Sequence, residues 1–103
     1  MMDFNQGDII KISGFKGVYF LIISKNTFIR VTGVFHVCPL ANQGSEGPLH
    51  IAVTGKENTS GVAMCEQIKL IDPQKRNCTR IDRIPYEDIM NVSDAIQGVF
   101  EYD

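Results

Sequence analysis

The sequence predicts a small, mainly β fold that curls into a strongly bent barrel and carries one helix at its C-terminal end. Two observations support this fold class. Short runs of β-branched and aromatic residues recur between turns rich in Gly, Asn and Ser, and only the segment after Pro85 has apolar residues at helical spacing. Because 103 residues suit one hydrophobic core, we expect a single domain over residues 1–103.

The central strand of the expected sheet is Val18–Ile23, because this run is apolar on both faces and rich in β-forming residues. Counting the similar runs gives about seven short strands, which is typical of a small barrel of SH3-like type. The segments from residue 62 to 71 fit two short strands or one bent strand. The expected strands are Ile9–Ile12, Val18–Ile23, Thr27–Val31, Val34–Leu40, His50–Thr54, Val62–Cys65, Ile68–Ile71 and Cys78–Ile84.

The C-terminal helix is expected to begin at Pro85, where the missing N–H of proline costs nothing. Glu87 and Asp88 follow in the first turn, where the helix dipole favours negative charge. The apolar positions of this segment form one stripe that we expect to lie across the sheet. The members of the stripe are Ile89, Val92, Ile96, Val99 and Phe100.

Composition excludes several classes of protein. Apolar residues make up 44% and charged residues 21% of the chain, which is typical of globular proteins and argues against disorder. No apolar run reaches the roughly 18 residues of a membrane span, and the first residues lack the features of a signal peptide, so we expect a cytoplasmic protein. Because the net charge is -2, any contact with nucleic acid has to come from a local patch.

The cysteines Cys38, Cys65 and Cys78 predict reduced, buried thiols, because their number is odd and none has C-x-x-C spacing. Only His36 lies close to a cysteine in the sequence, which is too few ligands for zinc. We therefore expect neither a metal ion nor a cofactor.

Glu66 and Gln67 are the most informative residues, because they sit inside otherwise apolar, strand-like sequence. Burying an amide without partners costs roughly 2–7 kcal/mol, and burying a charge costs more. Either the neighbouring loop satisfies these two side chains through hydrogen bonds, or they face a working surface. The residues alone leave both interpretations open.

The segment Gly61–Asp72 resembles the Gly-Val-x-x-x-Asp-Gln-Ile-Arg-x-Ile-Asp strand pair of the MazF/PemK family of toxins. The resemblance extends from the opening Gly7–Ile10 to the C-terminal helix, so it covers nearly the whole chain. Leu21–Ser24 resembles the family's Val-Val-Ile-Ser, Cys38–Leu40 its Val-Pro-Ile, and Ile81–Pro85 its Ile-Gly-Arg-Leu-Pro. The residues that match the family's helix are Pro85, Glu87, Ile89, Val92, Ala95 and Ile96.

The resemblance implies a MazF/CcdB-type barrel and a toxin of a type II toxin-antitoxin pair that cleaves single-stranded RNA. It also implies a cognate antitoxin and a homodimer. In this reaction a ribose 2′-hydroxyl attacks the adjacent phosphate, which requires a base, an acid and donors or a cation for the phosphate oxygens. Most family members supply an arginine and a threonine at positions that align with Val18 and Ala41, so the sequence leaves open whether enzymatic activity survives.

The remaining polar residues provide the candidate site. We expect Glu66, Gln67 and Lys16 to be catalytic, with Lys16 replacing the arginine; the alternative for Lys16 is a solvated turn lysine. His36 and His50 have no evident partner in the sequence, so we expect neither to be the general base. The alternative for the RNA-binding candidates is an ordinary loop and a solvated basic face. These RNA-binding candidates are Asn42, Gln43, Lys69, Arg76 and Arg80.

Two other functions remain as alternatives. One is a catalytically inactive MazF-fold protein that still binds RNA or an antitoxin. The other is kinship with CcdB, a gyrase poison of the same fold, because Cys38–Ala41 resembles its Ile-Pro-Leu-Ala. CcdB acts through a C-terminal Trp-Gly-Ile, whereas this chain has no tryptophan and ends Phe100–Asp103, which argues against this kinship.

Overall fold

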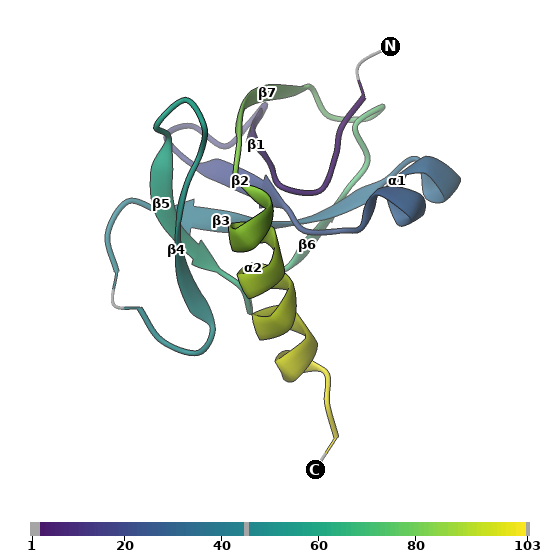
Figure 1. Cartoon of the computed structure of the whole chain (residues 1–103). Helices are drawn as coiled ribbons and strands as arrows, with labels where there is room; N and C mark the ends of the chain where they lie inside the picture. Colours follow the sequence, from purple (N-terminus) through teal and green to yellow (C-terminus); the bar gives the residue numbers. More distant parts are fainter. Residues whose placement is uncertain (1–2, 45, 103) are drawn as a thin grey trace.

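The computed structural model describes residues 3–44 and 46–102. Within these residues the chain forms seven strands and two helices (Figure 1). The helices are α1 (Asn26–Thr32) and α2 (Tyr86–Val99). The strands are β1 (Asp8–Ile12), β2 (Tyr19–Ile22), β3 (Phe35–Ala41), β4 (His50–Thr54), β5 (Ser60–Met64), β6 (Lys69–Ile71) and β7 (Cys78–Arg83).

The strands form one antiparallel sheet in the order β4-β5-β3-β2-β1-β7, with β6 beside β3 off this path. The seven-residue strand β3 organises the sheet, because it pairs with β2 along one side and with β6 and then β5 along the other. A short sheet of this kind bends strongly where one neighbour replaces another. The mainly β fold with a C-terminal helix is therefore confirmed.

The two ends of the strand order meet through the Asp82 side chain and one backbone hydrogen bond, from the Lys56 N–H to the Arg83 carbonyl at 2.9 Å, rather than through a ladder. Among the described residues no pairing joins β4 to β7. Instead, the turn between β4 and β5 docks on β7, where the backbone N–H groups of Glu57 and Thr59 donate to the Asp82 carboxylate at 2.9 and 3.0 Å. A Cβ atom added at Gly55 would overlap this carboxylate. The sheet therefore curls like a barrel, and Asp82 bridges its edges.

One expected strand is wrong. Thr27–Val31 is part of helix α1, which ends at Gly33 with a φ of 76° and a hydrogen bond from the Gly33 N–H to the Ile29 carbonyl at 2.8 Å. The β-branched residues of this segment favour a strand by propensity, but glycine in the left-handed region is a common helix C-terminus. The short helix also places Ile29 against the core, and this tertiary contact overrides the propensity.

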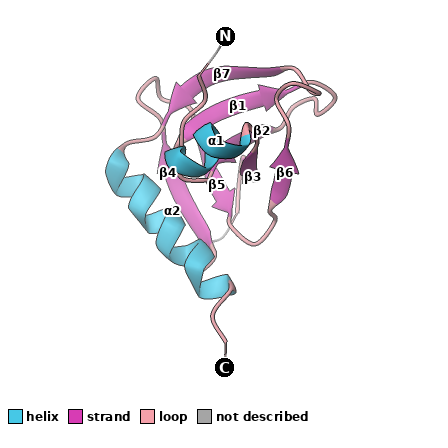
Figure 2. Ribbon diagram, turned by 90° about the vertical axis from the view of Figure 1, so that its right-hand side faces the viewer, coloured by secondary structure: helices cyan, strands magenta, loops and turns pink. Residues whose placement is uncertain are grey.

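Two clusters of buried residues form the core, one on each face of the sheet. The first includes Leu21, Cys38 and Cys65, and α2 packs on it through Ile89 and Ile96. The second includes Phe20 and Phe35 and lies under the N-terminal segment and α1. Figure 2 shows α2 along one side of the sheet and α1 on another. The two helices therefore cover different faces.

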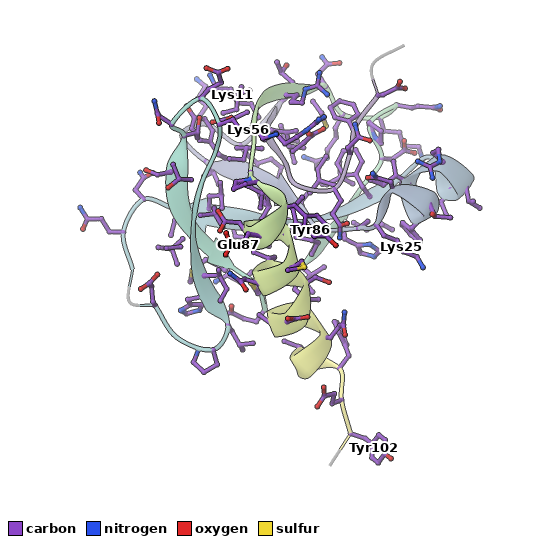
Figure 3. All side chains as sticks on the ribbon, in the orientation of Figure 1. Lys11, Lys25, Lys56, Tyr86, Glu87 and Tyr102 are labelled. Atoms are coloured by element: carbon purple, nitrogen blue, oxygen red, sulfur yellow. The ribbon has the colours of Figure 1, made fainter. Side chains whose placement is uncertain are left out.

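Helix α2 confirms most of the expected apolar stripe. Val92 is buried, and Ile89 and Ile96 pack against the first cluster. Val99 and Phe100 are exposed, so the expectation that they lie on the sheet is wrong. The reason is length, because the C-terminal part of the helix runs past the sheet, and Figure 3 shows Tyr102 at the far end of the molecule.

Candidate functional site

Glu66 and Gln67 lie in the turn between β5 and β6 rather than inside a strand. The Gln67 N–H donates to the Met64 carbonyl at 3.0 Å, which closes this turn. Both side chains are exposed, so the apolar sequence around them builds two short strands and not a polar site in the core. The interpretation of these residues as strand-like is corrected, and of the two earlier possibilities the exposed surface agrees with the structure.

His50 and Glu66 form a pair at this surface. The His50 Nε2 atom lies 3.0 Å from the Glu66 Oε2 atom, and about a third of each side chain is exposed. This hydrogen bond holds the pKa of the Glu66 carboxyl below its usual value. The carboxyl is therefore ionised over the whole range above acidic pH, next to an imidazole ring that can carry a proton.

The expectation that the two histidines lack partners is wrong. The His36 Nδ1 atom lies 2.8 Å from the Ser24 Oγ atom, and His50 contacts Glu66. The register of the β4–β5 hairpin, which the sequence alone does not give, explains why His50 has Glu66 as its partner. His50 pairs with Met64 across β4 and β5, and Glu66 follows two residues after Met64 in the turn that leaves β5, where its side chain reaches the His50 ring.

Two further expected residues belong to the loop that leads into β4. Asn42 and Gln43 are exposed directly after β3. The loop returns through an isolated bridge between Gly47 and His50, and the Leu49 carbonyl accepts the Cys65 N–H at 2.9 Å. The C-terminal part of the loop is thus anchored beside the turn that carries the His50–Glu66 pair, whereas Asn42 and Gln43 leave β3 beside the start of β5.

Lys69 belongs to the same end of the molecule. It is exposed, it begins β6 three residues after Glu66, and it pairs with Val37 of β3. The structure therefore gathers Glu66, Gln67, Lys69 and His50 around one surface, whereas Asn42 and Gln43 follow the other end of β3.

Lys16 lies in a different place, a groove of about 400 Å³ between the β1–β2 turn and the start of β7. The residues that line this groove include two lysines and no acidic residue. Arg76 extends its positive charge, because its guanidinium lies 5.1 Å from the ring of Phe15, one of the lining residues. The lining residues are Lys11, Ile12, Ser13, Gly14, Phe15, Lys16, Gly17, Val18, Tyr19, Asn77 and Thr79.

The groove and the Glu66 turn are far apart in one chain. Tyr19 of β2 and Ala63 of β5 both pair with Leu40 of β3, so β2 and β5 run in the same direction. Lys16 comes three residues before the first of these partners and Glu66 three residues after the second. They therefore lie at opposite ends of the part of the sheet formed by β2, β3 and β5.

Arg80 takes part in a structural ion pair. Its Nη1 atom lies 3.6 Å from the carboxylate of Asp8, and the Nε atom of Arg83 lies 2.8 Å from the same carboxylate. Asp8 is fully buried. Arg80 also donates to the Asp3 carbonyl at 3.2 Å, so its first task is to hold the N-terminal segment on β7.

Two features are absent from the part of the chain that the structure describes. No group of three or more His, Cys, Asp or Glu side chains in residues 3–44 and 46–102 is arranged to hold a metal ion. None of the helices in these residues has the length and apolar character required to span a membrane.

The positions that align with the family's arginine and threonine are apolar. Val18 lies one residue before β2, next to the pair of Tyr19 with Leu40, and Ala41 ends β3. The two positions therefore meet at the same end of neighbouring strands. Lys16 lines the same groove as Val18, so it is the cation nearest in sequence to the missing arginine.

Comparison with known proteins relates this chain to toxins. No curated protein is similar to it. The structure of MazE-MazF (Form-II) from Deinococcus radiodurans is similar with a TM-score of 0.83 and 16% identity, over 100% of both chains. An endoribonuclease from a mycobacterial species is similar with a TM-score of 0.78 and 16% identity, over 95% of this chain and 91% of that chain.

The family model of the PemK-like, MazF-like toxin of type II toxin-antitoxin systems matches residues 5–100. This range contains the whole sheet, both helices, the His50–Glu66 surface and the groove at Lys16. The chain therefore belongs to the PemK-like, MazF-like family of type II toxins.

Proposed function

We propose that this protein is the toxin of a toxin-antitoxin pair and acts as an endoribonuclease on single-stranded RNA. Family membership supports the toxin role, and the similar mycobacterial structure is described as an endoribonuclease. The single observation that carries the proposal is the exposed His50–Glu66 pair at 3.0 Å, because RNA cleavage needs a group that moves protons at an accessible surface.

The proposed chemistry is attack of a ribose 2′-hydroxyl on the adjacent phosphate. His50 removes the hydroxyl proton, and the Glu66 carboxylate orients the ring and stabilises the positive charge that the ring gains. The exposed amide of Gln67 donates a hydrogen bond to a phosphate oxygen, where negative charge develops. The same imidazolium can then return a proton to the leaving oxygen.

The remaining candidates bind the RNA chain on either side of this point. Lys69 is exposed three residues after Glu66 and contacts the nucleotide next to the cleaved bond, whereas Asn42 and Gln43 are exposed at the other end of β3 and contact nucleotides farther along the RNA. Lys16 lies at the other end of the part of the sheet formed by β2, β3 and β5, and Arg76 contacts the ring of Phe15 in the same groove as Lys16. We assign them to a distant phosphate of the same strand. Arg80 adds a weaker contact, because its guanidinium is already engaged by Asp8.

The proposed partners are single-stranded RNA, a cognate antitoxin and a second copy of this chain, and the proposed location is the cytoplasm. The similar structures include MazE-MazF from Deinococcus radiodurans and a mycobacterial endoribonuclease in complex with its cognate antitoxin. These complexes support an antitoxin as the partner. We expect a short open reading frame next to the one for this chain to encode the antitoxin.

The test is incubation of the purified protein with a mixed-sequence single-stranded RNA, followed by mapping of the fragment ends. We expect specific cuts that leave 2′,3′-cyclic phosphates, and a rate about 10²-fold lower for Glu66→Gln. Glu87→Gln is the matched control, because Glu87 is an exposed carboxylate at the start of α2. A wild-type protein that leaves the RNA intact would overturn the proposal.

A second candidate function is a MazF-fold protein that binds RNA or an antitoxin without cutting. The observation that favours it is the apolar pair of Val18 and Ala41, where most family members have an arginine and a threonine. RNA binding without cleavage in the same assay selects this candidate. The CcdB-like alternative is not favoured, because the family match is to PemK-like and MazF-like toxins.

A further inference from the structure

Cys38 of β3 lies across from Cys65, the residue that directly follows β5. The pairs of β3 with β5 are Leu40 with Ala63 and Ala41 with Val62. The same register, continued by two residues, sets Cys38 against Cys65. Both cysteines are fully buried and belong to the same core cluster, so their side chains are on the same face.

The backbone geometry at this position suits a cross-strand bond. The His36 carbonyl accepts the Ile23 N–H at 2.9 Å, so the backbone groups of Cys38, two residues on, also point toward β2. The Cys65 N–H points to the other side, toward the Leu49 carbonyl. The two cysteines are therefore a non-hydrogen-bonded pair, whose Cα atoms are typically about 4.5 Å apart, within the range of about 4.4–6.8 Å that disulfides require.

The two thiols already interact. Hydrogen bonding with Cys65 and burial raise the pKa of the Cys38 thiol, whereas the hydrogen bond from Cys38 lowers the pKa of the Cys65 thiol. Cys65 is therefore the better nucleophile of the pair. Cys78 differs from both, because it packs against the other core cluster and its Sγ atom contacts the Arg76 carbonyl at 3.5 Å.

The cysteine pair lies where strand pairing changes. Before the turn, the chain pairs with β3 in the register that sets Leu40 opposite Ala63. After the turn, from Lys69 onward, it pairs with β3 in the register that sets Val37 opposite Lys69. The three residues Glu66 to Ile68 absorb this change as a turn. Cys65 is thus the fixed point from which the turn with Glu66 begins, and a bond at Cys65 acts directly on the His50–Glu66 pair.

We propose that Cys38 and Cys65 form a reversible disulfide across β3 and β5 when the protein meets a hydroperoxide, and that this bond resets the Glu66 turn. When local opening of the adjoining turn exposes Cys65, its sulfur attacks the terminal peroxide oxygen, the O–O bond breaks, and an alcohol or water leaves with the thiol proton. The sulfur of Cys38 then attacks the sulfenic acid, forms the S–S bond and releases water. A thiol reductant returns both cysteines to thiols.

The disulfide is tested on the whole protein by brief exposure to hydrogen peroxide, alkylation of the remaining thiols and peptide mass spectrometry. We expect one cross-linked peptide pair that contains Cys38 and Cys65, a loss of two mass units, and an alkylated Cys78. Cys78→Ser is the matched control and forms the same bond, whereas Cys38→Ser does not. A wild-type protein that keeps three alkylatable thiols, or that oxidises at Cys78 first, overturns the proposal.

The effect on the turn is tested by NMR of the histidine rings, which does not depend on RNA cleavage. We expect the ring signals of His50 to shift on oxidation and to return with a thiol reductant, with smaller changes for His36, whose partner is Ser24. Unchanged His50 signals in the cross-linked protein would contradict the link between the bond and the turn. The role of the bond as a control of RNA cleavage rests on the proposed function, and a protein that forms the disulfide but never cuts RNA refutes only that function.

Discussion

Asp82 and Glu66 are both acidic residues at the edge of the same small sheet, and their surroundings are opposite. Asp82 is buried and accepts three backbone N–H groups, those of Glu57, Thr59 and Arg83, at 2.7 to 3.0 Å. Glu66 is exposed and its carboxylate contacts one movable partner, the ring of His50. A carboxylate whose acceptor positions are filled by backbone stabilises the fold, whereas one with free acceptor capacity at the surface can act on a ligand.

Asp82→Ala is expected to have the largest effect on stability, because three backbone donors lose their acceptor at once. We expect the free energy of unfolding to fall by about 3 kcal/mol. Urea denaturation followed by circular dichroism measures this change, with the exposed Asp94→Ala on α2 as the control. A loss no larger than that of the control would mean that Asp82 does not hold the barrel edges together.

Asp8→Asn is expected to cost less, about 2 kcal/mol, because asparagine still accepts one hydrogen bond but no longer offsets the charges of Arg80 and Arg83. Both arginines are about two-fifths exposed, so water compensates part of the loss. The same denaturation experiment gives the value. Equal midpoints for the variant and the wild type would contradict a stabilising role for this buried ion pair.

Glu66→Gln is expected to leave the urea midpoint unchanged, in contrast to both aspartate variants. The side chain is exposed, and an exposed ion pair of this kind contributes little to stability. A large fall in the urea midpoint would show that Glu66, like Asp82, stabilises the fold, and would contradict the contrast between the two carboxylates.

Acid titration separates the two carboxylates through their pKa values. Burial acts to raise the pKa of Asp82, but the hydrogen bonds from Glu57, Arg83 and Thr59 outweigh it and lower the pKa below its usual range. A lowered pKa in the folded state adds stability that is present above the unfolded value, about 3.9, and is lost as pH falls through the folded value. We expect Asp82→Asn to flatten the fall in stability below about pH 4, and Glu66→Gln to change it less. Thermal melts at stepped pH measure both.

Much of the fold can be predicted from local sequence patterns. Pro85 with Glu87 and Asp88 marks the start of α2, and apolar runs mark most strands. The predicted strand at residues 27–31 is wrong because β-branched residues favour strands in isolation, whereas the end of α1 is set by one backbone angle at Gly33. Strand propensity is a property of single residues, whereas the end of a helix depends on the residue that follows it.

The candidate site is less visible in the sequence, because it depends on register across strands. Glu66 stands out as a polar residue among apolar ones, but His50 is 16 residues away and becomes its partner only through the β4–β5 hairpin. For Lys16 the opposite holds, because the sequence places it with Glu66 in one site and the structure does not. It is a plausible cation in sequence, yet the parallel directions of β2 and β5 separate it from Glu66 within one chain.

A double-mutant cycle on RNA cleavage tests most directly whether His50 and Glu66 work as a pair. Cleavage rates of the wild type, His50→Gln, Glu66→Gln and the double variant are measured on one single-stranded RNA, with fragment ends mapped in each case. Each single variant is expected to lose about 10²-fold in rate, and the double variant little more, because the two residues act as a unit. Wild-type rates in both single variants would contradict the account.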